Sequence, residues 1–273
     1  MYTRVRPAAV AGAFYPDKPS TLEEQLRKLL EGAPRFPLAA PKAIIVPHAG
    51  YIYSGPVAAS IYAPLRRRSS TIRRVVLLGP THRVAIDGLA VPSCEAFATP
   101  LGEVPVDLEA IAALADLPQV RTNDAAHAQE HALEVQLPFL IETLERFTLV
   151  PLAVGRASPE DVAAVIERLW GGDETLIVVS SDLSHYLPYE SAWSIDGQTA
   201  QAIVALEANL TPHQACGAAP INGLLEVARR RGLHVRMIDL RNSGDTAGDK
   251  SRVVGYGAFA FFDAAPESPR HEH

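Results

Sequence analysis

Short apolar runs recur along the chain, separated by segments with helical spacing. The six runs, rich in β-branched residues, occupy 42–47, 74–79, 147–155, 175–182, 234–240 and 253–262. Continuous apolar runs of this length are typical of strands buried on both faces of a parallel or mixed sheet. The last run alternates in part between apolar and other residues, so we expect this strand to pair antiparallel.

The intervening segments carry apolar residues every three or four positions, which indicates helices that cover a core. The segment 20–34 opens with Ser20 and Glu23 in the spacing of a capping box and ends in Gly-Ala-Pro. Pro138 is expected to kink the long helical segment 132–147. Alternation of strands and helices predicts an α/β fold with helices on both faces of the sheet.

One domain accounts for this pattern. We expect it to span residues 1–263, because no internal repeat and no linker rich in glycine and serine interrupts it. The tail 264–273, "AAPESPRHEH", has a polar composition that predicts disorder.

Three of the predicted strands run into polar residues. His48 follows the first strand, His82 follows the second, and Asp182 and His185 follow the strand at 175–182. In open α/β sheets, ligands bind outside the carboxyl ends of the strands, so these side chains are expected to converge if the strands are parallel neighbours. A single histidine after a strand is commonly a surface residue, and Asp182 could simply cap a helix. The repetition favours a shared site.

Such a cluster suits metal binding and proton transfer. Imidazole titrates near neutral pH and is a common metal ligand. Two histidines and one oxygen ligand are typical of non-haem iron, and the same set also suits zinc or manganese. A further histidine beside the metal can act as a general base, while Asp182 can orient an imidazole or bind the metal directly. Tyr51, Tyr53 and Tyr186 could wall a substrate pocket.

The segment "HAQEHALEVQ" leaves three interpretations open. His127, Glu130 and His131 spell HxxEH, which is the inverted zinc-peptidase pattern if the segment is one helix. No downstream acidic ligand stands out. Glu130 and His131 could instead line the crevice at the strand ends, or the segment could be an ordinary polar helix start.

Two later segments give weaker indications. Asp245 and Asp249 lie in a loop that could bind a cation, but an ordinary turn explains them equally well. Cys216 has no partner base nearby in the sequence, which favours a packing role.

Composition excludes some classes. The chain has 273 residues, a net charge of -6 and a pI of about 5.8, which argue against nucleic acid or an anionic membrane as partner. Two cysteines form no disulfide framework and no cysteine-rich zinc motif. No apolar stretch is long enough to span a bilayer. We therefore expect a soluble, cytoplasmic protein.

Seven motifs in order resemble one family over nearly the whole chain. They are "RPAAVAGAFYP", "PHAGYIYSGPVAA", "LLGPTHR", "EHALEVQLPFL", "SSDLSHY", "CGAAPI" and "NSGDTAGD…VVGYGA". Together they resemble the Memo family, called AmmeMemoRadiSam system protein B in bacteria and archaea. This family is similar in fold to the LigB-type class III extradiol dioxygenases, which implies a single three-layer α/β/α domain with a mixed, largely parallel central sheet.

The resemblance also implies roles. His48 and His82 would be metal ligands, His185 would be an acid–base group, and Asp182 would line the same site. In animal relatives a late-loop cysteine completes the metal site, but Thr246 stands there in this chain. Asp245 could substitute for it. Otherwise two imidazoles alone should hold a divalent ion loosely.

Three functions follow as alternatives. The first is a metal-dependent oxidoreductase with non-haem Fe²⁺, acting with AMMECR1-like and radical-SAM proteins as the family name implies. The second is a non-catalytic accessory protein that keeps the cleft for a small molecule or peptide and needs no metal. The third is an HxxEH-type zinc peptidase.

Overall fold

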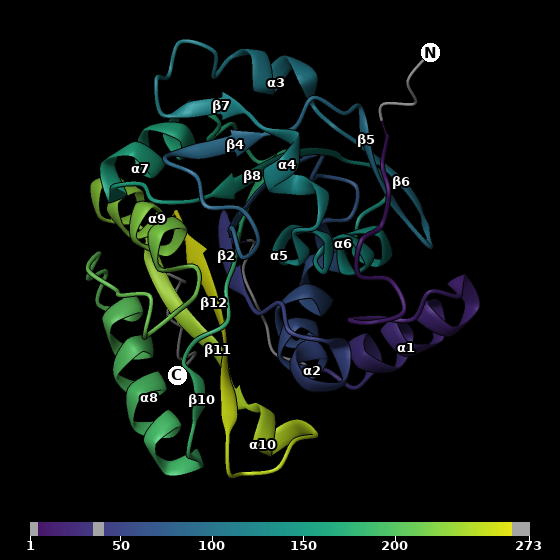
Figure 1. The fold of residues 1–273 in the computed structure, drawn as a ribbon, viewed down its shortest axis with the longest axis vertical. Coiled ribbons are helices and arrows are strands. Elements are labelled where there is room, and N and C mark those ends of the chain that lie inside the picture. The colour runs from purple at the N-terminus through teal and green to yellow at the C-terminus, as the bar shows by residue number, and fades with distance from the viewer. Residues whose placement is uncertain (1–4, 35–40, 264–273) are drawn as a thin grey trace, which may run out of the picture.

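The computed structural model describes residues 5–34 and 41–263. A nine-stranded central sheet has the order β10-β12-β2-β9-β3-β8-β4-β7, and β11 pairs with β12. The strands are β2 (Ala43–Val46), β3 (Arg74–Pro80), β4 (Leu89–Val91), β7 (Val120–Thr122), β8 (Thr148–Val154), β9 (Thr175–Ser180), β10 (His185–Leu187), β11 (His234–Asn242) and β12 (Val253–Phe262). The six predicted apolar runs are all strands of this sheet (Figure 1).

The middle of the sheet is parallel. Strands β2, β9, β3 and β8 run in the same direction as neighbours. Strand β12 pairs antiparallel with both β2 and β11, as its alternating pattern predicts. The predicted mixed, largely parallel sheet is therefore confirmed. Strands β4, β7 and β10 were not predicted, because each has only three residues, too few for a recognisable pattern in the sequence.

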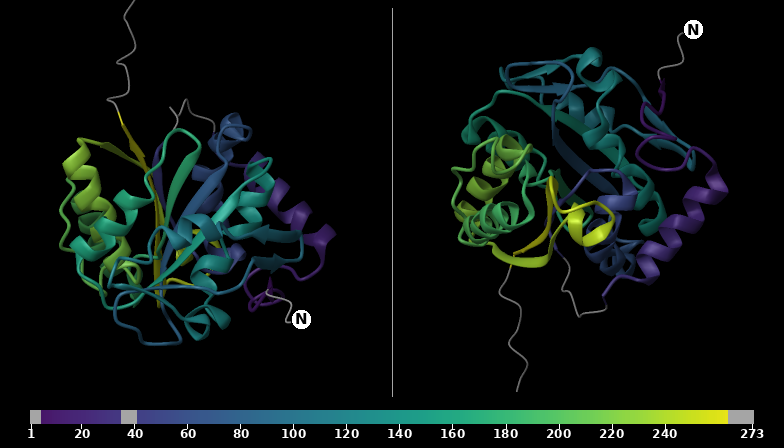
Figure 2. Two further views of the ribbon diagram at one scale, coloured as in Figure 1. Left: turned by 90° about the horizontal axis from the view of Figure 1, so that it is seen from above. Right: turned by 60° about the horizontal axis from the view of Figure 1, so that its bottom comes forward.

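Helices cover both faces of the sheet, and Figure 2 shows them on either side of the strands. On one face lie α1 (Pro19–Glu31), α2 (Tyr51–Tyr62), α5 (His131–Glu134) and α6 (Leu137–Thr143). On the other lie α7 (Pro159–Arg168), α8 (Tyr189–Val204) and α9 (Ala218–Arg231). In β2, Ile44 packs into the first core and Ile45 into the second, which explains why this strand is apolar throughout.

Smaller elements complete the described chain. A three-stranded sheet is formed by β1 (Val5–Arg6), β5 (Ala96–Thr99) and β6 (Gly102–Pro105). The remaining helices are short: η1 (Ala63–Arg68), α3 (Leu108–Ala112), α4 (Asp124–Ala128) and α10 (Ser243–Thr246).

Two helix starts differ from the sequence expectations. The predicted capping box at Ser20 and Glu23 is wrong. Helix α1 begins at Pro19, and its N-cap residue, Lys18, makes no side-chain capping hydrogen bond. Proline is suited to a first turn, where its missing N–H has no intrahelical acceptor. Pro138 also lies in a first turn, that of α6, so the predicted long helix is two short helices, α5 and α6, instead of one kinked helix.

Among the helices described, none combines the length and the apolar character needed to cross a bilayer. The domain boundary at residue 263 stays a prediction, and the tail 264–273 lies outside the described residues.

Candidate metal centre

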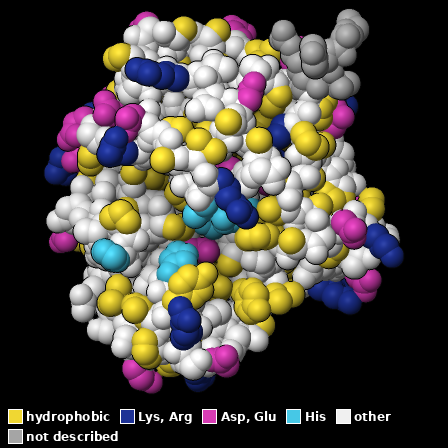
Figure 3. Space-filling view, in the orientation of Figure 1, with side chains coloured by type: hydrophobic (Ala, Val, Ile, Leu, Met, Phe, Trp, Pro, Cys, Tyr) yellow, Lys and Arg dark blue, Asp and Glu magenta, His cyan; other side chains and the backbone are white. Residues whose placement is uncertain are grey.

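Three adjacent parallel strands bring their polar ends to one edge of the sheet. His48 follows β2, Asp182 follows β9 and His82 follows β3, and β9 lies between the other two. The backbone N–H of His48 donates a hydrogen bond of 2.8 Å to Oδ1 of Asp182, which ties two of these ends together. Histidine side chains gather in a hollow near the centre of one face of the molecule (Figure 3).

A third histidine joins the two that follow strands. Ligand atoms of His48, His82 and His131 all lie within 4.8 Å of one another. The His82 and His131 rings are 4.3 Å apart, and each is 5.3 Å from the ring of His48. Gly79 permits this arrangement, because a Cβ there would lie 3.0 Å from Leu133 and 3.2 Å from Ala132 of α5. The glycine in β3 thus lets α5 approach closely and place His131 beside His82.

Glu130 fixes the orientation of His82. Its Oε2 accepts from the His82 backbone N–H at 2.6 Å, and its Oε1 lies 2.8 Å from Nδ1 of the His82 ring. Oε1 also accepts from the backbone N–H of Ala132 and lies 3.4 Å from Nδ1 of His131. Burial alone would raise the pKa of Glu130, but the hydrogen bonds from His82 and Ala132 outweigh it and hold the pKa at about 2. An ionised carboxylate only accepts, so Nδ1 of His82 donates to Glu130, and in the neutral form of the ring the lone pair lies on Nε2.

A hydroxyl fixes the proton of His48 in the same way. Ser180 Oγ donates to the carbonyl of Ala132 at 2.6 Å and accepts from Nε2 of Gln136 at 2.8 Å. Because its single hydrogen is used, Ser180 Oγ can only accept from Nδ1 of His48, 2.9 Å away. His48 therefore carries its proton on Nδ1 and its lone pair on Nε2.

Two imidazoles of this cluster, those of His48 and His131, are held neutral. Burial lowers the pKa of His48 to about 3, with a further contribution from His82, and lowers the pKa of His131 to about 4, where His48 adds to the effect. Neutral imidazole is the form that binds a metal ion. Near neutral pH these two rings are therefore ready to act as ligands without first losing a proton.

Asp182 and His185 lie beside the cluster. Burial raises the pKa of Asp182, although the His48 N–H and the charge of His185 oppose the effect. The sequence from Asp182 to His185 forms no helix but leads directly into β10, so Asp182 is not a helix cap. Tyr186, the next residue, has a φ of 58° and is 63% exposed, with the guanidinium of Arg252 5.2 Å from its ring.

The predicted pocket tyrosines separate into two kinds. Tyr53 is 37% exposed at the start of α2, and Tyr186 is more exposed still, so both side chains reach solvent. Tyr51 is 1% exposed, donates to the carbonyl of Val135 and packs on Phe139. The expectation for Tyr51 is therefore wrong, because its side chain belongs to the core and cannot line an open pocket.

Asp245 and Thr246 of the late loop lie outside the histidine cluster. Asp245 accepts from the hydroxyl of Tyr189 and from the backbone N–H of Asn242, as part of a capping box for α10. Thr246 directs its hydroxyl to the carbonyl of Ser243. Within residues 5–34 and 41–263, neither side chain is part of the cluster around His48, and the third side chain that could bind a metal ion there is His131.

His127 and His131 lie in different helices and do not form one site. It lies in α4, buried, with Nε2 2.9 Å from the carbonyl of Ala90, whereas His131 begins α5. The HxxEH motif requires one continuous helix to place both rings on one face, and the chain breaks its helix between them. The structure thus removes the geometric basis of a peptidase site and places Glu130 and His131 in the crevice.

Cys216 contacts His48, which was not apparent from the sequence. Its Sγ lies 3.3 Å from Nε2 of His48, although 168 residues separate them. Burial raises the pKa of this thiol to about 12 and keeps it protonated. Cys216 and Thr81, the neighbour of His82, also line a cavity of about 420 Å³ that includes Arg156 and the start of α9. This cavity therefore adjoins the histidine cluster and offers room for a ligand.

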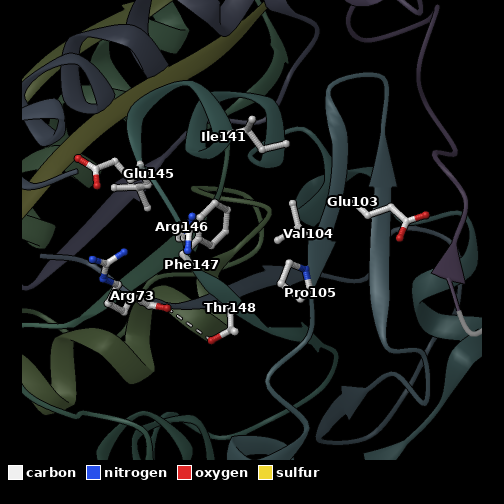
Figure 4. A pocket seen from close by; sticks show the side chains of 10 residues that line it. Arg73, Glu103, Val104, Pro105, Ile141, Glu145, Arg146, Phe147 and Thr148 are labelled. Atoms are coloured by element: carbon white, nitrogen blue, oxygen red, sulfur yellow. Dashed lines mark hydrogen bonds between the residues drawn. The ribbon is translucent and has the colours of Figure 1, made fainter. Parts of the chain in front are cut away.

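Another cavity, of about 570 Å³, lies away from the cluster between β6 and the end of α6. Ile141, Val104 and Phe147 line it, with Glu103 and Arg146 among its charged residues (Figure 4). It contains no histidine or cysteine, so it lacks the groups that bind transition metals.

The donor set fits a first-row transition metal. Three imidazoles, two of them with a ring proton fixed on Nδ1, can supply three ligand atoms to one ion. The buried His48/His82/His131 cluster could thus hold a metal ion, and imidazoles alone do not select among iron, zinc, copper and nickel.

Comparison with known proteins shows the family of the chain. The family model described as "Memo-like protein" matches residues 6–260. A MEMO1 family protein of Aquifex aeolicus is 37% identical, over 93% of this chain and 97% of the relative. One of Sulfolobus acidocaldarius is 33% identical, over 95% of this chain and all of the relative. A crystal structure of an uncharacterized Escherichia coli K12 protein covers 79% of this chain and 98% of its own, with 13% identity and a TM-score of 0.49. The family match over nearly the full chain, together with relatives of this identity, shows that the chain belongs to the Memo-like protein family, the MEMO1 family.

Proposed function

We propose that this protein is a metal-dependent oxidoreductase whose cluster binds Fe²⁺. The observation that carries the proposal is the mutual 4.8 Å limit among ligand atoms of His48, His82 and His131. Iron in such a site provides redox chemistry with open coordination positions for a substrate. The likeness of the Memo family to ring-cleaving dioxygenases favours iron over zinc.

The roles of the residues follow from their contacts. His48, His82 and His131 would hold the ion, while Glu130 and Ser180 orient the rings of His82 and His48. Fixed ring orientation raises ligand basicity and affinity.

Proton transfer would fall to Asp182 and His185. Asp182 is buried and its pKa is raised, which brings it nearer to the range useful for accepting and returning a proton. Tyr53 and Tyr186, both reaching solvent, would contact the substrate at the mouth of the cleft.

The alternative is an accessory protein that binds a small molecule or peptide without catalysis. The cavity beside Cys216 is compatible with either function. We further propose AMMECR1-like and radical-SAM proteins as partners, on the basis of the family name alone.

Anaerobic titration with Fe²⁺ followed by exposure to O₂ tests the proposal. Wild type is expected to bind one equivalent and to consume O₂ when a substrate is present, and His82→Ala is expected to lose the binding. Stoichiometric ligand binding in the cleft by a metal-free protein, with no affinity for Fe²⁺, would support the accessory function instead.

A further inference from the structure

The cavity shown in Figure 4 lies at the opposite edge of the sheet from the histidine cluster. Arg73 directly precedes β3 and Thr148 begins β8, so the cavity is at the amino ends of these two strands, whereas His82 follows the carboxyl end of β3. Strand β3 has seven residues, which separates the cavity from His82 by roughly 20 Å. A molecule bound in this cavity therefore cannot reach the proposed metal site.

The floor of the cavity is apolar and belongs to the core. Val104 is 2% exposed and Leu144 is 5% exposed, and both are part of the core on this face of the sheet. Ile141 and Phe147 pack against the same core but are only partly buried, so each also offers apolar surface to the cavity. The volume of about 570 Å³ is in the range of small-molecule sites. The cavity therefore has room for the apolar body of a small ligand.

Two arginines that line the cavity have guanidinium groups without an acceptor. Arg74 donates to the carboxylate of Asp107 at 2.8 Å. In the part of the chain that the structure describes, no hydrogen bond or ion pair engages the guanidinium group of its neighbour Arg73 or that of Arg146. A guanidinium group presents a planar fork of donors that matches the two oxygens of a carboxylate. The cavity thus combines apolar surface with donors suited to an anion.

The two carboxylates that line the cavity do not use these donors. Glu145 accepts from the hydroxyl of Ser69 at 3.2 Å, outside the apolar part of the cavity. Figure 4 shows the carboxylate of Glu103 directed away from its neighbour Val104. The same view shows the arginines across the cavity from Val104, so an anion beside them does not meet Glu103.

We propose that this cavity binds a small amphipathic carboxylate, a molecule with an aliphatic body and one carboxylate group. The aliphatic body lies against Ile141 and Phe147, and the carboxylate accepts from Arg73 and Arg146. A neutral molecule with the same aliphatic body fills the apolar space but leaves both guanidinium groups without a charged acceptor, so it binds more weakly. This site is independent of the proposed metal centre and of its chemistry.

Titration of the purified full chain with octanoate, followed by amide NMR spectra, tests the proposal. Wild type is expected to bind one equivalent with a Kd below about 1 mM, and to shift the amide signals of Val104 and of 141–148 but not those around His48. Octanol, which has the same chain length and no charge, should bind about tenfold more weakly. Arg73→Gln combined with Arg146→Gln should weaken octanoate binding about tenfold and leave octanol binding unchanged. Arg236→Gln is the matched control, because Arg236 is exposed on β11 outside this cavity, and it should bind octanoate as wild type does.

Four results would overturn the proposal. The first is equal affinity of wild type for octanoate and octanol, and the second is unchanged octanoate binding in the double variant. The third is the absence of amide shifts at the cavity, or shifts confined to the residues around His48. The fourth is a dependence of the cavity signals on protein concentration without octanoate, which would show that a second copy of the chain covers the surface. The comparison of octanoate with octanol on wild type decides the matter even if the double variant does not fold.

Discussion

Glu130→Gln is the substitution that most directly challenges the account of the cluster. The carboxylate of Glu130 is 1% exposed and accepts from the His82 backbone, the His82 ring and the Ala132 backbone. A glutamine has one oxygen and one NH₂ group in place of two acceptors. Whichever way the amide is turned, an N–H group faces at least one N–H of the protein.

The orientation of the glutamine amide determines which ring nitrogen of His82 carries the proton. If the NH₂ group replaces Oε1, it can donate to Nδ1 of His82, which moves the ring proton to Nε2 and removes the lone pair from the ligand face. Loss of such an orienting carboxylate typically weakens metal affinity about 10- to 100-fold. The buried mismatch is also expected to cost about 1–3 kcal/mol of unfolding free energy.

Metal affinity and stability must be measured separately. Isothermal titration of Co²⁺ gives the affinity, and urea denaturation gives the free energy of unfolding. Glu134→Gln is the matched control, because Glu134 is also buried and accepts from Arg6, Tyr15 and the backbone of Val10. Glu134→Gln should lose a comparable amount of stability and leave the metal affinity of the folded protein unchanged. If Glu130→Gln binds Co²⁺ within about twofold of wild type, the carboxylate does not set the state of His82 and the reasoning is refuted.

Three further predictions concern the surroundings of the cluster. Ser180→Ala removes the acceptor for Nδ1–H of His48, so it should lower the unfolding free energy by about 1–3 kcal/mol in urea and weaken Co²⁺ binding; unchanged affinity would contradict the assigned ring proton. Burial lowers the pKa of His127 to about 4, so below pH ~6.5 the unfolded chain binds more protons than the folded chain, and the unfolding free energy should fall as the pH drops toward 4. In His127→Gln this loss of unfolding free energy should be smaller by about 3 kcal/mol. An equal pH dependence of the unfolding free energy in the two proteins would contradict the prediction. Gly79→Ala places a Cβ 3.0 Å from Leu133, so it should displace His131 and weaken Co²⁺ binding more than it lowers the melting temperature; an unaltered cobalt spectrum would argue against this.

The arrangement of the sheet was readable from the sequence because burial on both faces leaves a plain signal. Strands β2, β3 and β9 lie in the parallel middle of the sheet, and each contains a continuous apolar run. The polar residues that follow them, His48, His82 and Asp182, were therefore conspicuous in the sequence. The three-residue strands could not be predicted from the sequence, since tertiary pairing sets their positions: β4 pairs with β8, β7 with β4 and β10 with β12.

The place of His131 in the cluster was harder to predict from the sequence, for a different reason. His131 was considered for the crevice, but the choice between it and the peptidase pattern depended on whether α4 and α5 form one helix. The break between them follows from Glu130, whose backbone is extended and whose side chain caps α5. The contact of Cys216 with His48 could not be read at all, because no local pattern records a pairing across 168 residues.

The central claim is that one metal ion sits among His48, His82 and His131. Crystals of the protein grown with Fe²⁺ or Co²⁺ under anaerobic conditions, with data collected on both sides of the metal absorption edge, test it most directly. The account predicts one anomalous peak at about 2.0–2.2 Å from a ring nitrogen of each of the three histidines. A peak at the late loop of Asp245, or at His127, or no peak in a fully loaded crystal, would contradict it.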